Sequence, residues 1–471
     1  MKIDLKSTTS KILIVVILGL VIRLFFTFFV AKAYFGRENI YFDFDFWAWA
    51  KSIENLFIHG SYTFDPANPY GYFGRMPGYS VFIGIFYLFT GDWMKTLPII
   101  AIVQILLDTI AIYLIYKTGL VILKKTNYAL FLSFIYATYP FIIVWNPVAY
   151  SESTSIFFLI LFLYLFFKNT SGYVFLSGVA LSIAIQCRPQ IIILIPLCLL
   201  LFFMYKNNIQ NIFKKIAWFS LAILLFYGSW PVRNYLINHK VLLTQDLRAF
   251  HTAGEDWLSF CQYIYSVKTD FEPQFSQIIK NQKVEMPAIA YSVPGDSAKL
   301  EKVISLSKNC GSSFSHWSGY WKETFDEPNC NSEIVKLYNE LRESQVKNNP
   351  YHYYIKLPLQ NLQKALFKFK LNNTTGIRKF ASLLFIYRTF LILAGFFGLL
   401  LMFFKKENRH IAFVILGYFV LLYLFLCAGT GPQLRNIEMR YFLPADILML
   451  IPSTYFFFSI KNYLKKILRF R

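Results

Sequence analysis

Residues 41–79 read YFDFDFWAWAKSIENLFIHGSYTFDPANPYGYFGRMPGY and directly follow the first strongly apolar segment of the chain. The stretch therefore begins where a membrane helix would end. It carries two carboxylates, Asp43 and Asp45, among aromatic residues, and then a turn-forming region rich in Pro, Gly and Tyr. Acids with aromatic neighbours at a membrane exit are unusual for a simple connecting loop, so both acids are candidate functional residues.

The composition is that of a membrane protein. Hydrophobic residues make up 56% of the 471 residues and aromatic residues 20%, and the apolar residues form continuous blocks of membrane-span length. Continuous blocks favour helices over a membrane β-barrel, whose strands alternate. The predicted fold class is an all-α polytopic membrane protein. The net charge of +21 falls largely in short loops at helix ends, where the positive-inside rule explains it, so no nucleic-acid partner is expected.

Ten apolar segments are predicted to cross the membrane. The first is expected to be a retained helix, because no small-residue cleavage site follows its apolar run. Lysine clusters follow several of the segments and also mark both chain ends, so the positive-inside rule places both termini in the cytoplasm. The predicted spans are 12–35, 96–116, 128–145, 154–167, 173–187, 191–205, 216–229, 382–404, 411–427 and 442–460.

Residues 77–89 form an eleventh apolar run that is short for a span, which needs about 20 residues. A full crossing here would place every later lysine cluster up to Lys215 on the outer side. A half-span or an interfacial segment keeps all the clusters inside, as the positive-inside rule requires. We therefore predict that residues 77–89 do not cross the membrane.

The chain is predicted to divide into three parts. The long polar stretch 240–379 contains no spanning segment and is expected to form a domain of mixed structure outside the membrane. Membrane helices precede it and follow it. The predicted parts are residues 1–235 with a first outer loop at 36–79, the loop domain at 236–380, and the C-terminal membrane helices at 381–471.

Three cysteines share the loop domain, namely Cys261, Cys310 and Cys330. Disulfides form in oxidising compartments, so two of them can pair if the domain faces such a compartment. Because the number is odd, at least one of the three remains free or pairs elsewhere. The sequence does not decide which, and no metal-binding spacing is visible among them.

Several charged residues at the predicted outer face are not explained by the positive-inside rule. Each alone has a structural explanation: Glu152 can cap the following helix, and Arg188 can be a snorkelling helix end. Together, in separate loops at one membrane face, they indicate a functional site. Arg23, midway along the first span, has no assigned role. The outer-face residues are Asp43, Asp45, Arg75, Glu152, Arg188, Arg233 and Arg440.

Acids and arginines together at a membrane face suit the transfer of a sugar from a lipid phosphate to a hydroxyl group. Arginine binds phosphate in a bidentate manner, and a carboxylate can act as the general base on the acceptor hydroxyl. The surrounding spans can hold a long lipid tail. Aromatic residues near the acids, such as Trp49 and Tyr72, can stack on sugar faces, although aromatic residues also gather at membrane interfaces for other reasons.

Short motifs follow one another along residues 10–450 in an order that resembles the GT-C glycosyltransferases, which use polyprenyl-phosphate sugars. The similarity is to the bacterial relatives of dolichyl-phosphate-mannose–protein mannosyltransferases and to the aminoarabinose transferases. The chain departs from the pattern at Ser80, where a second proline is usual, and in the swapped order of Trp230 and Pro231. The motifs are DFWAW (45–49), HG (59–60), RMPGY (75–79), SES (151–153), RP (188–189), SWPVRNY (229–235) and RYFLP (440–444).

The resemblance implies roles for individual residues. Asp45 is the candidate catalytic base, favoured over Asp43 by its spacing to the HG motif, so the outer loop 36–79 would be catalytic. Glu152 would be a second acid near the acceptor or a metal. The donor phosphate would be bound by Arg440 above all, with Arg75, Arg188 and Arg233. The expected contacts to the acceptor or the sugar are Trp49, Tyr72 and His251.

The resemblance also implies an activity. The chain would be an inverting hexosyl- or pentosyltransferase that moves a sugar from a polyprenyl-phosphate donor to a hydroxyl of a glycan, lipid or protein acceptor. It would lie in a bacterial inner membrane with its site on the periplasmic side. Metal use differs among GT-C enzymes, so the sequence leaves open whether Asp45 and Glu152 hold a divalent metal such as Mg²⁺ or Mn²⁺. The choice of acceptor is expected to depend on residues 240–379, which lie outside the resemblance.

Two other function classes stay open at the level of sequence. A flippase or transporter of a lipid-linked sugar would also need arginines in a membrane cavity, but transporters tend to show internal repeats and midplane sites, and no repeat is visible here. A polymerase or ligase of O-antigen-type glycans would have a long outer loop with arginines and a histidine base. Arg248 and His251 lie in the long loop here.

Overall fold

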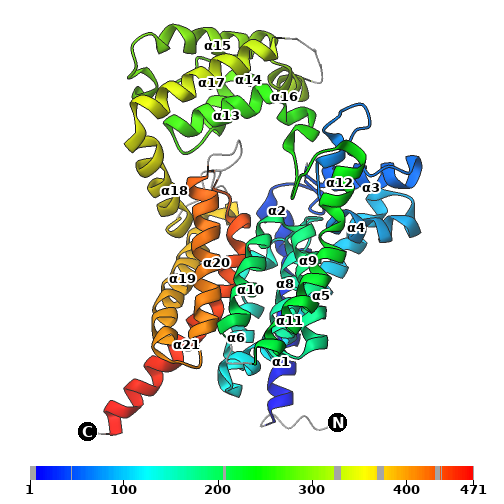
Figure 1. Ribbon diagram of the computed structural model, residues 1–471, viewed down its shortest axis with the longest axis vertical. Helices are drawn as coiled ribbons and strands as arrows, with labels where there is room; N and C mark the ends of the chain where they lie inside the picture. Colours follow the sequence, from blue (N-terminus) through cyan, green and yellow to red (C-terminus); the bar gives the residue numbers. More distant parts are fainter. Residues whose placement is uncertain are drawn as a thin grey trace.

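The computed structural model describes residues 7–43, 45–204, 208–322, 330–368, 376–429, 435 and 437–469. Every regular element within these residues is a helix, which confirms the predicted all-α class. The helices form a long bundle with a smaller helical domain at one end (Figure 1). The first helix begins and the last helix ends at the opposite end of the bundle, far from this domain (Figure 1).

The bundle contains, among the described residues, seven helices that are long and apolar enough to cross a membrane, together with three shorter apolar helices. Large side chains such as Phe29 and Phe404 are 75% and 85% exposed, as expected for groups that face lipid tails. The long spans are α1, η1 and α2 (together Thr8–Phe35), α5 (Trp93–Leu123), α8 (Ser151–Lys168), α11 (Ile209–Phe226), α19 (Ala381–Phe404), α20 (Arg409–Ala428) and α21 (Met439–Arg469). The shorter helices are α4 (Pro77–Thr90), α9 (Ser171–Cys187), and η3 with α10 (Pro189–Met204).

Helix α4 is short and packs against the helix of the first outer loop. Its 14 residues rise about 21 Å, which is less than the roughly 30 Å of a bilayer core. At its end, Tyr87 stacks on Trp93 with ring centroids 4.2 Å apart, and its hydroxyl donates to Glu54 at 3.3 Å. Glu54 belongs to α3 (Phe46–His59), the helix of the first outer loop. These contacts keep the end of α4 beside the first outer loop, and that residues 77–89 do not cross the membrane stays a prediction.

The segment predicted as the span 128–145 is interrupted in the structure. Helix α6 (Thr126–Ala137) ends before Pro140, which begins the short helix α7 (Pro140–Ile143). Proline lacks a backbone N–H and disfavours the helical conformation of the residue before it. Tyr139 accordingly has an extended backbone, with φ −74° and ψ 108°. The chain after this break forms part of a cavity wall described below.

Two buried ion pairs lie inside the bundle. Arg23 on α1 pairs with Asp108 on α5 at 2.7 Å, and these side chains are 0% and 1% exposed. Arg388 on α19 pairs with Asp446 on α21, also at 2.7 Å. A charge inside a bundle needs a partner because it has lost its hydration. Arg23, which the sequence left without a role, therefore joins α1 to α5.

The domain at the end of the bundle is helical throughout its described residues, whereas the sequence predicted mixed structure. Its core packs aromatic residues of different helices together, among them Phe260, Tyr263 and Tyr338. The helices are short and carry charged residues on their outer faces, so the stretch appears polar in sequence. Its elements, from the end of the bundle onward, are α12 (Ser229–Asn238), η4 (Leu247–Ala249), η5 (His251–Ala253), α13 (Glu255–Val267), α14 (Glu272–Ile279), η6 (Ala288–Tyr291), α15 (Asp296–Cys310), α16 (Ser312–Lys322), α17 (Asn331–Asn348), η7 (His352–Lys356), α18 (Leu357–Leu366) and η8 (Gly376–Phe380).

One disulfide bond joins Cys310 to Cys330, 20 residues apart, with a Cα–Cα distance of 5.4 Å. It ties the end of α15 to the residue that precedes α17. Cys261 is buried and free. Of the three cysteines whose pairing the sequence left open, these two form the bond and Cys261 packs in the core of the domain.

Candidate active site

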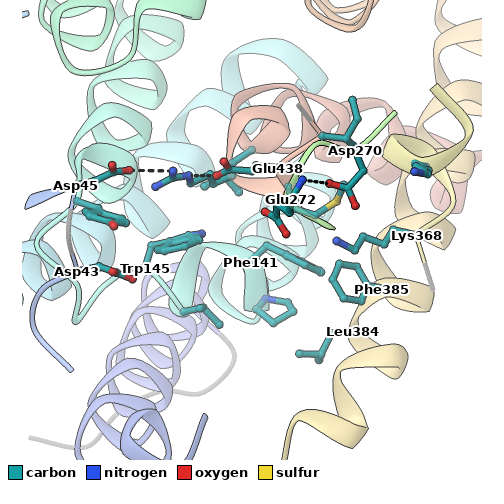
Figure 2. Close-up of a pocket in the computed structure, with 18 of the residues that line it drawn as sticks. Asp43, Asp45, Phe141, Trp145, Asp270, Glu272, Lys368, Leu384, Phe385 and Glu438 are labelled. Carbon is teal, nitrogen blue, oxygen red and sulfur yellow. Dashed lines mark hydrogen bonds and ion pairs between the residues drawn. The ribbon is translucent and has the colours of Figure 1, made fainter. Parts of the chain in front are cut away.

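Asp45 lies at the start of α3, where the chain turns from the first outer loop into the helix. Its side chain makes no capping hydrogen bond to α3, and the carboxylate instead faces two arginines from distant parts of the chain. The Oδ2 atom accepts a hydrogen bond from Arg440 Nη2 at 3.0 Å (Figure 2). The Oδ1 atom lies 3.6 Å from Arg75 Nη2. Asp45 thereby joins α3, the turn before α4 and the start of α21.

The charges of the two arginines decide the ionisation of Asp45. Burial by itself raises the pKa of a carboxyl group because it penalises the charged form. The nearby charges of Arg75 and Arg440 and the hydrogen bond from Arg440 outweigh burial, and together they hold the pKa of Asp45 below its ordinary value of 3.8. The side chain nevertheless stays 37% exposed. Asp45 is therefore an ionised carboxylate that remains accessible to a ligand.

Arg440 is held between two carboxylates. Besides Asp45, its guanidinium donates through Nε to Glu438, two residues earlier in the chain. The guanidinium also lies 5.3 Å from the ring centroid of Tyr150. Sequence reasoning did not select Glu438, although the EMRY stretch places an acid beside the arginine of the RYFLP motif. Glu438 is thus a further acid of the site, with 36% of its side chain exposed.

Arg75 reaches the site because the turn before α4 packs tightly on the end of α9. A Cβ atom on Gly78 would lie 2.6 Å from the Gln186 Cβ atom, so only glycine permits this close approach. The Arg75 guanidinium carbon stacks 4.7 Å from the Trp49 ring centroid. Stacking of this kind orients the plane of the guanidinium and leaves its edge available to an anion. The RMPGY motif therefore positions Arg75 beside Asp45.

Glu152 and Arg188 form a second, deeper ion pair. Glu152 is 1% exposed and Arg188 is 8% exposed. Arg188 Nε and Glu152 Oε2 are buried and make no hydrogen bond with any residue in the described ranges. Glu152 lies in the first turn of α8, which begins at Ser151, whereas the capping interpretation placed it before the helix. Its carboxylate is directed at Arg188 and does not cap the helix.

Two cavities meet at Asp45. The first has a volume of about 960 Å³ and lies between the bundle and the domain (Figure 2). The second has about 970 Å³ and lies against α9, η3 and α20. Four residues line both cavities, namely Asp45, Trp317, Glu438 and Arg440. Asp43 lines only the first cavity. Trp49, Arg75 and Arg188 line only the second.

Asp43 is close to Asp45 but has a different arginine partner. Its Oδ2 atom lies 2.9 Å from Arg37 Nη1. Figure 2 shows Asp43 beside Trp145 at the same side of the first cavity as Asp45. The structure thus keeps both acids at one cavity, and the arginines from the more distant motifs contact Asp45.

Two of the expected residues, Arg233 and Tyr72, lie outside both cavity linings. Arg233 donates to the backbone carbonyl oxygens of Tyr62 and Tyr72, so it fastens the first outer loop to α12. Tyr72 contributes its carbonyl to this contact, and its ring lies beside the Arg233 guanidinium. The roles expected of Arg233 and Tyr72 stay predictions, and the structure adds that backbone carbonyls accept from the guanidinium expected at a phosphate. His251 lies in η5, and its side chain is outside the described part of the structure.

The described residues do not fit a divalent metal. Within them, no group of three or more His, Cys, Asp or Glu side chains is arranged to hold a metal ion. Of the two acids that would bind one, Asp45 has two arginines within 4 Å, and Glu152 is paired with Arg188. Positive charges at these distances would repel a cation. We therefore derive no catalytic step from a metal.

Residues 75–232 match the model of the dolichyl-phosphate-mannose-protein mannosyltransferase family. The match covers about a third of the chain and includes Arg75, Glu152 and Arg188, whereas Asp45 and Arg440 lie outside it. No curated protein sequence matches the chain. The match confirms the resemblance that the motifs predicted.

Solved structures of an archaeal enzyme share the fold. The Archaeoglobus fulgidus oligosaccharyltransferase in complex with zinc and sulfate superposes with a TM-score of 0.52 and 12% identity, over 96% of this chain and 49% of that chain. The same enzyme tethered to an acceptor peptide containing the NVT sequon gives 0.50 and 13%, over 95% and 49%. This chain therefore spans about half the length of these structures. The predicted GT-C-like membrane fold is confirmed.

Proposed function

We propose that this protein is a glycosyltransferase that moves a sugar from a polyprenyl-phosphate donor to an acceptor hydroxyl at the periplasmic face of a bacterial inner membrane. The observation that carries this proposal is the position of Asp45, an accessible carboxylate at the meeting point of two cavities. One cavity is lined by arginines and the other is not, apart from the shared Arg440. A base between an anion-binding cavity and a second cavity suits transfer between two substrates.

The second cavity suits the donor phosphate. Arg75, Arg188 and Arg440 line it. Three side-chain N–H donors at its lining, Arg75 Nε, Arg188 Nε and Gln190 Nε2, are buried and make no hydrogen bond with any described residue. Buried donors without partners are costly, so an anion that accepts from them would be strongly favoured.

The same cavity has room for the beginning of a lipid tail. Phe425 and Leu426 of α20 form part of its wall, and α20 is one of the helices long enough to cross a membrane. A polyprenyl chain can therefore leave the cavity along the bundle while its phosphate stays at the arginines. The family model that matches residues 75–232 is named for a dolichyl-phosphate-linked donor, which agrees with this assignment.

The chemistry follows from these positions. Asp45 removes the proton of the acceptor hydroxyl, and the acceptor oxygen attacks the anomeric carbon of the donor sugar. The bond from that carbon to the phosphate oxygen breaks, and the lipid phosphate leaves with the bonding electrons. The charges of Arg75, Arg188 and Arg440 stabilise the leaving phosphate. Attack opposite to the leaving group inverts the configuration of the anomeric carbon.

The ion pairs of Asp45 fit this sequence of events. Without donor, Arg75 and Arg440 neutralise the carboxylate. A bound phosphate would compete for both guanidinium groups, which raises the pKa of Asp45 and makes it a stronger base. The base would thus become active when the donor is in place.

Asp45→Asn tests the proposal directly. An amide cannot take the acceptor proton, so transfer from a labelled polyprenyl-phosphate sugar to acceptors in native membranes should fall by about 10² to 10⁴-fold. Binding of the donor to the purified variant should be retained, because the arginines remain. Glu38→Gln in the same loop, where Glu38 is 85% exposed and paired with Lys32, is the matched control and should transfer normally. Full transfer by Asp45→Asn would exclude Asp45 as the base.

A further inference from the structure

The first cavity has one apolar wall that comes from membrane helices. Phe141 and Val144 follow the break before α7, Leu384 and Phe385 lie on α19, and Leu443 lies on α21. Figure 2 shows Phe141, Leu384 and Phe385 grouped together, away from the acids Asp45 and Glu438. A wall of this composition is suited to hydrocarbon and offers no hydrogen bonds from its side chains.

The apolar wall continues onto the lipid-facing surface of the bundle. Phe380 and Leu383, next to Leu384 and Phe385 in the chain, are 66% and 62% exposed. Leu383 lies in the first turn of α19 and Phe380 directly precedes that helix, which is long and apolar enough to cross a membrane. Exposed side chains of this size at a membrane helix are expected to contact lipid tails. A chain bound in the cavity would therefore extend directly into the bilayer.

The opposite wall of the cavity is polar and comes from the domain. Lys364 and Lys368 line it, together with Asp270 and Glu272 near the start of α14. Lys368 makes no hydrogen bond or ion pair with any residue in the described ranges, and its Nζ atom lies 5.8 Å from the Phe385 ring centroid. Burial lowers the pKa of Lys368 despite the opposing charge of Glu272. Lys368 is therefore a partly buried cation that no described residue contacts through a hydrogen bond, and the charge of Glu272 only partly compensates its lost hydration.

We propose that the first cavity binds a lipid acceptor whose hydroxyl-rich headgroup carries a phosphate. This inference rests on the function proposed above, because it assigns the cavity to the acceptor. The hydrocarbon lies along the Phe141, Leu384 and Phe385 wall, and the phosphate is bound by Lys368. Hydroxyl groups donate to Asp270 and Glu272, and one hydroxyl reaches Asp45. A soluble peptide would leave the apolar wall and Lys368 without suitable partners.

Binding measurements separate this inference from catalysis. Native mass spectrometry of the purified full chain should show binding of dioleoylphosphatidylglycerol, which has hydroxyl groups and a negative charge, in preference to dioleoylphosphatidylcholine, which has neither hydroxyl groups nor a net charge. Lys368→Gln should weaken phosphatidylglycerol binding about ten-fold, the order expected for one charged hydrogen bond. Lys368→Arg should restore it. Lys347→Gln, at an exposed position on α17 away from both cavities, is the matched control.

The phosphate-bearing headgroup can belong to a glycolipid or to a glycerophospholipid, and the same binding measurement distinguishes the two. A polyprenyl-diphosphate-linked disaccharide, offered in place of phosphatidylglycerol, should be the stronger ligand if the acceptor is a glycolipid. A glycerophospholipid acceptor would reverse that order. Gln190→Ala should weaken binding of polyprenyl phosphate in the second cavity, whereas Lys368→Gln should leave it unchanged. Opposite effects of Gln190→Ala and Lys368→Gln on the binding of the two ligands would show that the two cavities bind different lipids.

The outcomes also separate this inference from the proposed function. Equal binding of both phospholipids, or no effect of Lys368→Gln on either acidic lipid, would overturn the lipid acceptor while Asp45→Asn still abolished transfer. Transfer to a peptide with no lipid requirement would overturn it as well. Conversely, full transfer by Asp45→Asn would contradict the proposed base, yet Lys368-dependent lipid binding would show that the first cavity is a lipid site.

Discussion

Asp45 is the residue at which burial and charge act in opposite directions. Burial raises the pKa of its carboxyl group, whereas Arg75 and Arg440 lower it. The effect of the arginines is the larger one, so the folded-state pKa lies below the ordinary value of 3.8. Because the pKa is depressed by folding, the ion pairs stabilise the fold above the unfolded-state pKa, and this contribution is lost as pH falls through the folded-state value. The carboxylate is therefore ionised throughout the neutral range.

The pH dependence of catalysis should report this balance. If Asp45 is the base, kcat/KM for the donor, which reflects the free enzyme, should fall only below about pH 4. Arg75→Gln removes one of the charges that lower the pKa of Asp45, so the acidic limb of the pH–rate profile should move to higher pH. The measurement is the initial rate of transfer at low donor concentration over a pH series. Arg342, whose guanidinium contacts Gln262 and Glu343 in the domain, provides the control, and Arg342→Gln should leave the acidic limb of the pH–rate profile in place. If Arg75→Gln also left that limb in place, Asp45 would be excluded as the titrating group.

Among the helices, the break between α6 and α7 is held by the two buried ion pairs. The Tyr136 hydroxyl donates to Asp108, and the Tyr139 hydroxyl donates to Asp446 at 3.0 Å. Arg23 also donates to the Ala137 carbonyl at 2.9 Å, which satisfies a carbonyl at the end of α6. The two pairs therefore fix the α6–α7 break to both halves of the bundle. After the break, Pro140, Phe141, Val144 and Trp145 line the first cavity.

Arg388→Met should be strongly destabilising because it leaves Asp446 buried without its charged partner. Loss of one member of a buried pair costs about 3–5 kcal/mol, whereas replacing both members with apolar residues is often neutral. The double variant Arg388→Met with Asp446→Leu should therefore recover most of the loss. Titration of the purified protein with a denaturing detergent, monitored by helical circular dichroism, measures both effects. The control is Arg409→Met at an exposed position, which should change the free energy of unfolding by less than about 0.5 kcal/mol. A double variant as unstable as Arg388→Met would contradict the claim that the unpaired Asp446 charge causes the loss.

Element boundaries were only partly predictable from the sequence, and the reasons are local and specific. The apolar blocks and lysine clusters identify the spans, since both depend on composition alone. The interruption at Pro140 was missed because the apolar run continues through it, although proline and its preceding residue do carry the signal. The partner of Arg23 could not be predicted, because Asp108 lies 85 residues away and the pairing depends on how α1 packs against α5.

At the level of the whole molecule, the motifs predicted which residues belong to the site better than they predicted the contacts between them. Asp45, Arg75, Arg188 and Arg440 come to two adjoining cavities from separate segments of the chain. Glu438 was missed because it lies outside every motif. The carbonyl partners of Arg233 could not be predicted, because its motif does not show which segment of the chain it will meet. The apolar wall of the first cavity requires α7, α19 and α21 to converge, and no single segment of the sequence encodes that.

The arrangement of the whole chain across the membrane gives the last prediction. Ala67 lies in the first outer loop, whose Asn68 side chain donates to the Arg248 carbonyl of the domain at 2.9 Å. Thr126 follows α5, whose 31 residues extend about 45 Å from the domain end of the bundle. Both positions are exposed, and they should therefore lie on opposite sides of the membrane.

Cysteine labelling measures this sidedness. The four free native cysteines are all buried, so they should contribute little background with a membrane-impermeant maleimide. Ala67→Cys should react in intact cells with a permeabilised outer membrane, because the loop and the site are proposed to face the periplasm. Thr126→Cys should react only after lysis, since Lys124 and Lys125 beside it follow the positive-inside rule. The reverse labelling pattern would place Asp45 and both cavities on the cytoplasmic side, where the donor sugar would have to be presented on the inner leaflet. That result would contradict the proposed periplasmic reaction and would leave the fold unchanged.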